Sequence, residues 1–147
     1  MTLSRTRPVV GGRQGAVASA HPLASQAGLD ILQSGGHAVD AVVAMAATLA
    51  VVEPYMSGPG GVGFLLLYQA DGPPRVLNFS GTSPTGAVPE AFDEQTSELG
   101  PRSCLVPGNV AGWFEALRAH GRLTPADIFA PAIRHGREGF PLHPANA

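Results

Sequence analysis

The feature that most constrains the fold is a segment from Ala38 to Val52 whose polar residues are limited to Asp40 and Thr48. A helix with no polar face must be buried on several sides. The stretch from Ala41 to Val52 has 12 residues, whereas a helix needs roughly 20 to span a bilayer. The segment therefore predicts a buried helix and no membrane span. The helix is expected to end at Glu53-Pro54, because proline disfavours helix at the residue before it.

Three further helices are predicted from apolar spacing and from the residues at their ends. Proline is favoured at a first helical position, glycine follows a last turn, and threonine is a good N-cap. On the predicted third helix, Val110, Trp113, Phe114 and Leu117 share one apolar face. The predicted ranges are Pro22 to about Ser34, about Pro107 to His120, and Thr124 to about Glu138.

Strands are predicted at Gly15–Ala20, Phe64–Tyr68 and Arg75–Phe79. Asp71-Gly72 is a strong turn signal, so the last two strands should form a hairpin. The continuous apolar run of Phe64–Tyr68 predicts burial on both of its faces. Residues 80–103 read as irregular. This order of strands and helices predicts an α+β fold with helices packed on a sheet.

The loop Ser57–Gly63 has four glycines. A phosphate-binding loop would follow a strand and precede a helix, whereas here a helix precedes and a strand follows, and the loop has no lysine. A close passage of the backbone past another segment fits the glycines better.

No residue pattern in the sequence forms a catalytic or metal site. Cys104 is the single cysteine and is predicted to be a small buried residue. Ser19 lies near His21 but lacks an orienting group, and Asp40 is explained as a cap at the start of its helix. No metal and no cofactor are expected. The five histidines lack metal-ligand spacing and are interpreted as capping or surface residues: His21, His37, His120, His135 and His143.

The charge distribution also limits the partners. The net charge is −2 and the nine basic residues are scattered, which argues against nucleic acid as a partner. Charged residues make up 14% of the chain, a low share that suggests that other protein covers part of its surface. No signal sequence is visible, so a cytoplasmic location is expected as the sequence stands.

Several motifs, in order along residues 9–147, resemble the γ-glutamyltranspeptidase family. Gly35–Ala41 is similar to the family's Gly-Gly-Asn-Ala-Val-Asp-Ala, and Val51–Gly58 is similar to its Val-Glu-Pro-x-x-Ser-Gly. The other matching segments are Ala16–Ser25, Gly63-Phe64, Val106–Gly112, Pro131–Arg134 and Glu138–Pro141.

This resemblance implies part of a four-layer αββα N-terminal-nucleophile hydrolase sandwich. Members act in glutathione metabolism or as acyltransferases and hydrolases, and many are periplasmic or extracellular. A precursor cuts itself into a large and a small subunit, and the small subunit's new N-terminal threonine is the nucleophile. Residues 15–147 resemble an incomplete large-subunit region, preceded by an extension at residues 1–14. The threonine would lie beyond Ala147, so no catalytic residue is assigned and the chain alone is predicted to be inactive.

The implied partners are the rest of the large subunit, the small catalytic subunit, and a small amide or γ-glutamyl substrate. In γ-glutamyl-specific members, an arginine and an acidic residue follow the strand equivalent to Val76–Phe79, and the arginine holds the donor's α-carboxylate. Here Ser80 and Gly81 occupy these positions. They are the candidate substrate-binding residues, although Ser80 is equally well explained as a plain turn residue.

Three interpretations remain open at this stage. The chain is part of a γ-glutamyltransferase or amidohydrolase, part of a family amidase for another acyl group such as oxamate, or a truncated non-catalytic fragment or pseudoenzyme.

Overall fold

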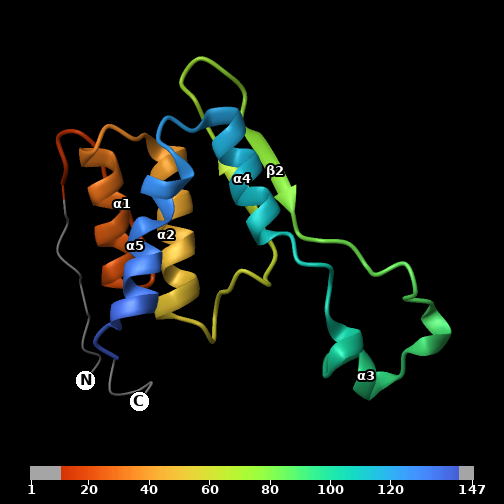
Figure 1. Cartoon of the computed structure of the whole chain (residues 1–147). Coiled ribbons are helices and arrows are strands. Elements are labelled where there is room, and N and C mark those ends of the chain that lie inside the picture. Colours follow the sequence, from red (N-terminus) through yellow and green to blue (C-terminus); the bar gives the residue numbers. More distant parts are fainter. Residues whose placement is uncertain (1–10, 143–147) are drawn as a thin grey trace, which may run out of the picture.

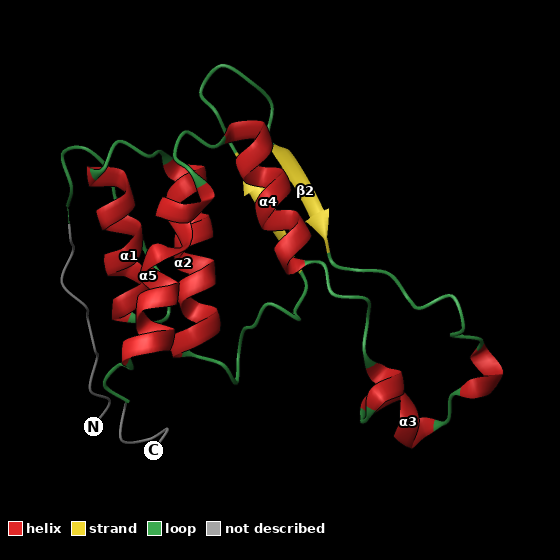
Figure 2. Ribbon diagram, viewed as in Figure 1, coloured by secondary structure: helices red, strands yellow, loops and turns green. Residues whose placement is uncertain are grey.

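The computed structural model describes residues 11–142, and this part of the chain is mostly helical with one two-stranded sheet (Figures 1 and 2). Most of the expected extension, residues 1–10, and the last residues, 143–147, lie outside the described residues. No helix in the described part is long and apolar enough to cross a membrane. The elements are α1 (Pro22–Gln33), α2 (Ala38–Val52), β1 (Gly63–Leu67), β2 (Arg75–Phe79), the 3₁₀ helix η1 (Pro89–Ala91), α3 (Glu94–Glu98), the 3₁₀ helix η2 (Pro101–Ser103), α4 (Asn109–His120) and α5 (Pro125–Glu138).

Helix α2 lies at the centre of the core, which confirms its prediction as a buried helix. It packs against α1 and α5, which lie beside it (Figure 1), and also contacts α4. Val43 and Ala44 are 1% and 0% exposed. The buried side chains around them come from α1, α4 and α5, and include Ile31, Ala116, Leu117, Ile128 and Ala132.

The ends of α1 and α5 follow the predicted capping chemistry. After α1, Gly35 has a φ of +93°, and the N–H groups of Gly35 and Gly36 donate to the carbonyls of Leu32 and Ile31. This left-handed termination satisfies carbonyls that the helix leaves unpaired. At the start of α5, the Thr124 hydroxyl accepts from the Asp127 N–H, as expected of an N-cap.

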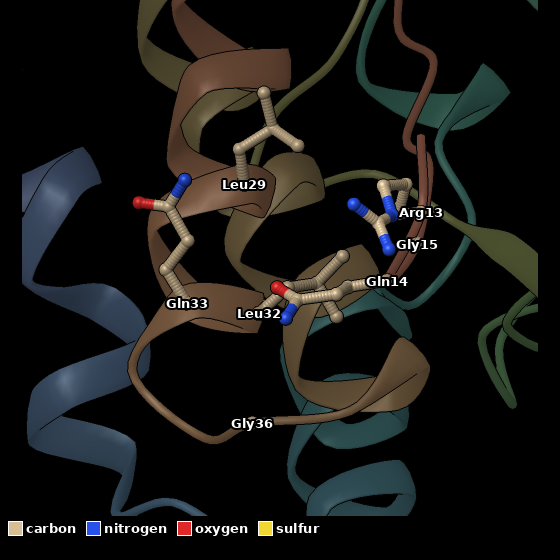
Figure 3. Close-up of a pocket in the computed structure, with 7 residues that line it drawn as sticks. All are labelled: Arg13, Gln14, Gly15, Leu29, Leu32, Gln33 and Gly36. Atoms are coloured by element: carbon tan, nitrogen blue, oxygen red, sulfur yellow. The ribbon is translucent and has the colours of Figure 1, made fainter. Parts of the chain in front are cut away.

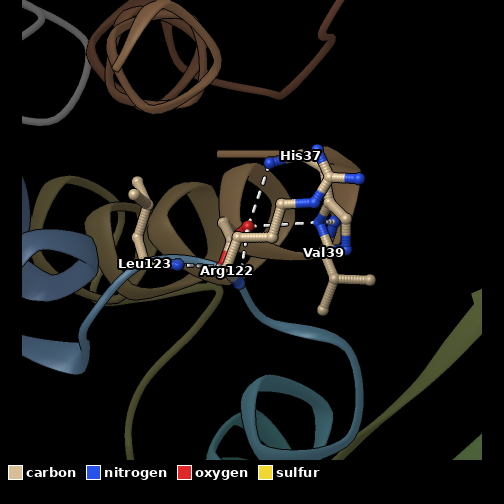
Figure 4. A network of polar contacts seen from close by, with 5 residues as sticks. His37, Val39, Arg122 and Leu123 are labelled. Atoms are coloured by element: carbon tan, nitrogen blue, oxygen red, sulfur yellow. Dashed lines mark hydrogen bonds and ion pairs between the residues drawn. The ribbon is translucent and has the colours of Figure 1, made fainter. Parts of the chain in front are cut away.

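Asp40 joins the start of α2 to the connection between α4 and α5 (Figure 4). Its buried carboxylate accepts from the N–H of His37 at 2.9 Å and from the N–H of Arg122 at 3.0 Å, with a longer bond from Leu123 at 3.4 Å. At the same helix start, His37 Nδ1 accepts from the Val39 N–H. Burial would raise the pKa of Asp40, but the three backbone donors and nearby His37 outweigh burial and hold the pKa below its ordinary value.

The hairpin forms as predicted, with β1 and β2 antiparallel and Leu65 opposite Leu77. The expectation that β1 is buried on both faces is wrong for this chain. Leu65, Leu67 and Leu77 face the helices and pack against the core. The opposite face is exposed, at 66% for Phe64, 72% for Leu66 and 63% for Val76. Side chains alternate along a strand, and among the described residues only the helix-facing side is covered.

Residues 80–106 leave the body of the molecule and return to it, carrying α3 at their far end (Figures 1 and 2). The prediction of an irregular segment is wrong in part, because three short helices form there. Within this segment, the Arg102 guanidinium donates to the Ala91 carbonyl and so joins η2 to η1. Cys104 is exposed, so the prediction that it is buried is also wrong. Its segment lies away from the core.

Two other sequence predictions need correction. Residues 15–20 form no strand, because the ladder in the described part joins only β1 and β2 and leaves this segment unpaired. Helix α4 begins at Asn109, two residues after the predicted start, with Gly108 as its N-cap. Of the four residues on the predicted apolar face of α4, Trp113 and Leu117 are buried, whereas Val110 and Phe114 are 42% and 47% exposed.

Candidate functional site

The predicted site residues, Ser80 and Gly81, directly follow β2 in a segment without regular secondary structure; with the Asx turn that Asn78 makes there, this segment is called the Ser80–Gly81 turn. Asn78 shapes the turn, because its Oδ1 accepts from the Ser80 N–H at 2.9 Å. Gly81 has a φ of +82°, in the region that favours glycine. A Cβ at Gly81 would also collide with the Val106 carbonyl oxygen. The backbone geometry and the close contact thus both require glycine at this position.

The turn lines a pocket of about 410 Å³ between the end of β2 and the first half of α4. Ser80 is half-buried there. A small polar hydroxyl and the backbone of the turn are therefore available to a ligand. The lining residues are Leu77, Asn78, Phe79, Ser80, Gly81, Thr82, Gly108, Ala111, Gly112 and Glu115.

The pocket wall depends on glycine in α4 as well. A side chain at Gly108 would collide with the Phe79 carbonyl, and one at Gly112 would collide with the Phe79 ring. These glycines let α4 approach the end of β2 closely. The strand end, the turn and the start of α4 form one tightly packed junction.

Among the described residues that line the pocket, the charged one is Glu115, and none is a lysine or arginine. Glu115 accepts two hydrogen bonds from the Arg118 guanidinium, at 2.6 and 2.9 Å. These bonds hold the pKa of Glu115 below, and the pKa of Arg118 above, their ordinary values. The pocket therefore presents a paired carboxylate and no free cation.

A larger groove of about 830 Å³ lies elsewhere, between residues 13–15 and the C-terminal half of α1 (Figure 3). Arg13 and Gln33 contribute polar groups, and Leu29 and Leu32 contribute apolar surface. None of its lining residues is a serine, threonine, cysteine, histidine or carboxylate. The groove is separate from the Ser80–Gly81 turn and lacks a group suited to acyl transfer.

The other candidates from the sequence take structural roles. The Ser19 hydroxyl bonds to the His21 carbonyl and to the Ser25 hydroxyl, and not to an imidazole nitrogen. His21 and His37 are the N-caps of α1 and α2. Within residues 11–142 no group of three or more histidine, cysteine, aspartate or glutamate side chains is placed to hold a metal.

Asn109 is a feature of the site region that sequence reasoning missed. Its side chain is buried at the start of α4 and donates to the Gly58 carbonyl, 51 positions earlier. This contact confirms that the glycine loop passes close to another segment. The four glycines indicated a close approach, but no sequence signal identified Asn109 as the partner.

Comparison with known proteins agrees with this architecture. Residues 24–147 match the family model described as gamma-glutamyltranspeptidase. The crystal structure of γ-glutamyltranspeptidase from Helicobacter pylori superposes with a TM-score of 0.85 at 36% identity, covering 90% of this chain and 40% of that chain. The chain belongs to the γ-glutamyltranspeptidase family.

Curated relatives include proteins named for different reactions. Glutathione hydrolase proenzyme 1 of Schizosaccharomyces pombe is 39% identical in a 138-position alignment that covers 92% of this chain and 22% of the relative. Oxamate amidohydrolase proenzyme of Klebsiella pneumoniae is 41% identical in a 141-position alignment that covers 90% of this chain and 27% of the relative. The chain thus spans about a quarter of the length of these relatives, and it matches an N-terminal portion of the large subunit.

Proposed function

We propose that this chain forms one wall of the acyl-donor pocket in an amide-cleaving acyltransferase or hydrolase of the family. The observation that carries the proposal is the pocket at the Ser80–Gly81 turn. This turn stands where γ-glutamyl-specific members of the family are expected to hold the donor. Family membership supports the reaction type, and the pocket supports a binding role for this part of the chain.

The chemistry would be completed by residues beyond Ala147. An N-terminal threonine would attack the amide carbonyl and form an acyl-enzyme, with its own α-amino group as the base. Water or an amine would then accept the acyl group. The part of the chain that the structure describes contributes substrate positioning, and the nucleophile comes from the small catalytic subunit.

The chemistry of the pocket favours a donor other than a γ-glutamyl group. An arginine can hold a carboxylate through two charge-assisted hydrogen bonds, whereas Ser80 can offer one neutral bond. Glu115, the charged lining residue, is paired with Arg118, so the described lining residues offer a donor carboxylate no cation. We therefore place the substrate among related amides whose recognition needs no arginine at this turn. The oxamate amidohydrolase relative, and an acylase of a Pseudomonas strain that is 37% identical, support such a breadth of donors within the family.

The exposed face of the hairpin supports a larger assembly. Phe64, Leu66 and Val76 form an apolar face that the described part of the chain leaves open. In the proposed complete enzyme, a second sheet covers this face and yields the four-layer αββα sandwich. The rest of the large subunit and the small subunit would supply that sheet and the outer helices.

The test uses the full-length gene product that contains this chain. A chromogenic γ-glutamyl anilide is compared with oxamate and with neutral acyl amides by measuring kcat/KM. We expect at least one of these other amides to be the better substrate. Failure to hydrolyse any amide would refute the proposed function, and a clear preference for the γ-glutamyl anilide would refute the substrate assignment.

The Ser80→Arg variant probes the pocket directly. A new charge-assisted pair with the donor carboxylate is worth about 1.5–3 kcal/mol, so kcat/KM for the γ-glutamyl anilide should rise at least about tenfold. Ser83→Arg is the matched control, because Ser83 is exposed and is not a lining residue. No rise in Ser80→Arg, or an equal rise in the control, would contradict the role of Ser80.

A further inference from the structure

Asn109 is a buried polar residue whose position is not explained by capping its own helix. It is 7% exposed and is the first residue of α4. The N-cap before it is Gly108, which has no side chain that could cap the helix. Asparagine is a favoured N-cap, yet here its amide points out of the helix toward the glycine loop. A buried side-chain amide that bonds so far along the chain holds two segments together.

The asparagine binds a tight turn in the glycine loop. The Gly58 carbonyl accepts from the Gly61 N–H at 3.0 Å and from Asn109 Nδ2 at 2.8 Å. The Gly61 carbonyl in turn accepts from the N–H groups of Gly108 and Asn109, at 3.1 and 3.0 Å. A Cβ on Gly61 would lie 2.7 Å from Asn109 Nδ2, so this approach needs glycine. The 58–61 turn is thereby fixed to the start of α4.

The opposite side of the same segment holds the candidate site. Gly108 lies against the Phe79 carbonyl, and the Gly81 backbone lies against the Val106 carbonyl. The Val106 N–H donates to the Thr82 carbonyl at 3.0 Å. Residues 106–112 therefore contact the 58–61 turn on one side and the Ser80–Gly81 turn on the other. A shift at Asn109 would move both turns, because close contacts and hydrogen bonds join each turn to residues 106–112.

We propose that Asn109 is a positioning residue that holds the Ser80–Gly81 turn in the geometry required for the donor. The effect on substrate binding rests on the proposed function, whereas the effect on the position of the turn does not. Asn109 does not line the pocket. It acts through the backbone of residues 106–108, which its hydrogen bonds fix against the glycine loop.

The Asn109→Asp variant tests the structural part in the 147-residue chain. Aspartate has the same shape, but its carboxylate oxygen cannot donate and would face the Gly58 carbonyl. Loss of one hydrogen bond, worth about 0.5–1.5 kcal/mol, corresponds to amide exchange up to about tenfold faster at Gly61 and Val106. The Ile128 N–H, bonded to Thr124 within α5, serves as the internal reference and should be unchanged.

Val110→Ala is the matched control, because Val110 is the next residue of α4 and is 42% exposed. It should leave exchange at Gly61 and Val106 as in the wild type. If Asn109→Asp does not fold, Asn109→Ser, which keeps a shorter donor, is measured and should show the same local pattern with smaller amplitude. If the Val106 N–H exchanges as slowly in the folded Asn109 variant as in the wild type, the proposal is wrong.

Kinetics of the full-length gene product test the catalytic part. Asn109→Asp should raise KM for the preferred amide by about tenfold while kcat changes less, because the donor wall is displaced and the nucleophile is not. The double variant Asn109→Asp/Ser80→Ala should lose less kcat/KM than the product of the two single-variant losses, since both changes act on the same turn. If the two losses in kcat/KM simply multiply, the proposal that Asn109 acts through the position of Ser80 is wrong. A wild type that hydrolyses no amide would refute the proposed function, while the exchange measurement would still decide the role of Asn109.

Discussion

Helix α2 and strand β1 are the two most apolar segments of the chain, and the structure treats them differently. Along α2, residues on several sides are buried, including Val39, Val43 and Val52 at 1–2% exposure. Along β1, burial alternates, and Phe64 and Leu66 are among the exposed large side chains. Similar hydrophobicity in the sequence thus corresponds to burial on most sides of α2, where Val42 is the exposed large side chain, and to burial on one face of β1.

The difference lies in the neighbours that the chain itself provides. Helices α1, α4 and α5 surround α2, whereas the hairpin is packed against helices on one face only. Neighbouring exposed apolar side chains typically mark an interaction surface. The chain therefore contains most of the surroundings of α2, although Val42 is 40% exposed, and only half of those of the hairpin. This agrees with its covering about a quarter of its relatives' length.

The sharpest test of this comparison places the same charge in both segments. Val43→Asp buries an unpaired carboxylate in α2 and should destabilise the 147-residue chain by more than about 4 kcal/mol. Leu66→Asp places it on the open face of β1 and should cost about 1 kcal/mol or less, a strand-propensity effect. Urea unfolding followed by circular dichroism measures both. A large loss of stability in Leu66→Asp would show that the described chain covers this face in solution.

A smaller effect is expected where α2 depends on a polar contact and not on packing. Asp40→Ala would leave the N–H groups of His37, Arg122 and Leu123 without their buried acceptor, at a cost of about 2–3 kcal/mol. Asp71→Ala, in the exposed hairpin loop, is the matched control and should change stability by no more than about 0.5 kcal/mol. Equal stability of the two variants would mean that the join between α2 and the α4–α5 connection contributes little.

The sequence predicted most local structure because the signals for it are local. The bounds of α2 and β2 were predicted as found, and the proline, threonine and glycine signals at helix ends were confirmed. These features depend on a few neighbouring residues. The role of Asp40 as a cap was also predicted, whereas its bonds to Arg122 and Leu123 were not, because they join residues 82 and 83 positions apart.

Predictions failed where burial depends on partners far along the chain. The segment at residues 15–20 has strand composition but no partner strand among the described residues, and Cys104 lies on a segment that leaves the core. At the candidate site, the family resemblance suggested Ser80 and Gly81 as substrate-binding residues, but it gave no reason to select Asn109. The close packing of Gly81, Gly108 and Gly112 around Phe79 and Val106 emerges only when all three segments are placed together.

The dependence of stability on pH gives a finer test of the polar contact in α2. Backbone hydrogen bonds hold the pKa of Asp40 below its ordinary value of 3.8 despite its burial. A carboxyl whose pKa is lower in the folded state binds fewer protons there than in the unfolded chain. Its stabilising contribution is therefore complete above the unfolded value and is lost as the pH falls through the folded value.

The expected result is a pH-dependent difference between the wild type and Asp40→Asn. Asparagine keeps the shape and one acceptor oxygen but does not titrate. In urea unfolding from pH 7 down to pH 3, the stability advantage of the wild type should be constant near neutrality and shrink below about pH 4, where protonation of Asp40 in the unfolded chain begins to favour unfolding. His37, whose Nδ1 lies 3.1 Å from Asp40 Oδ2, is the nearest titratable neighbour, so His37→Asn in both backgrounds separates its contribution. An advantage that stays constant to pH 3 would contradict the role of the ionised carboxylate in holding α2 to the α4–α5 connection.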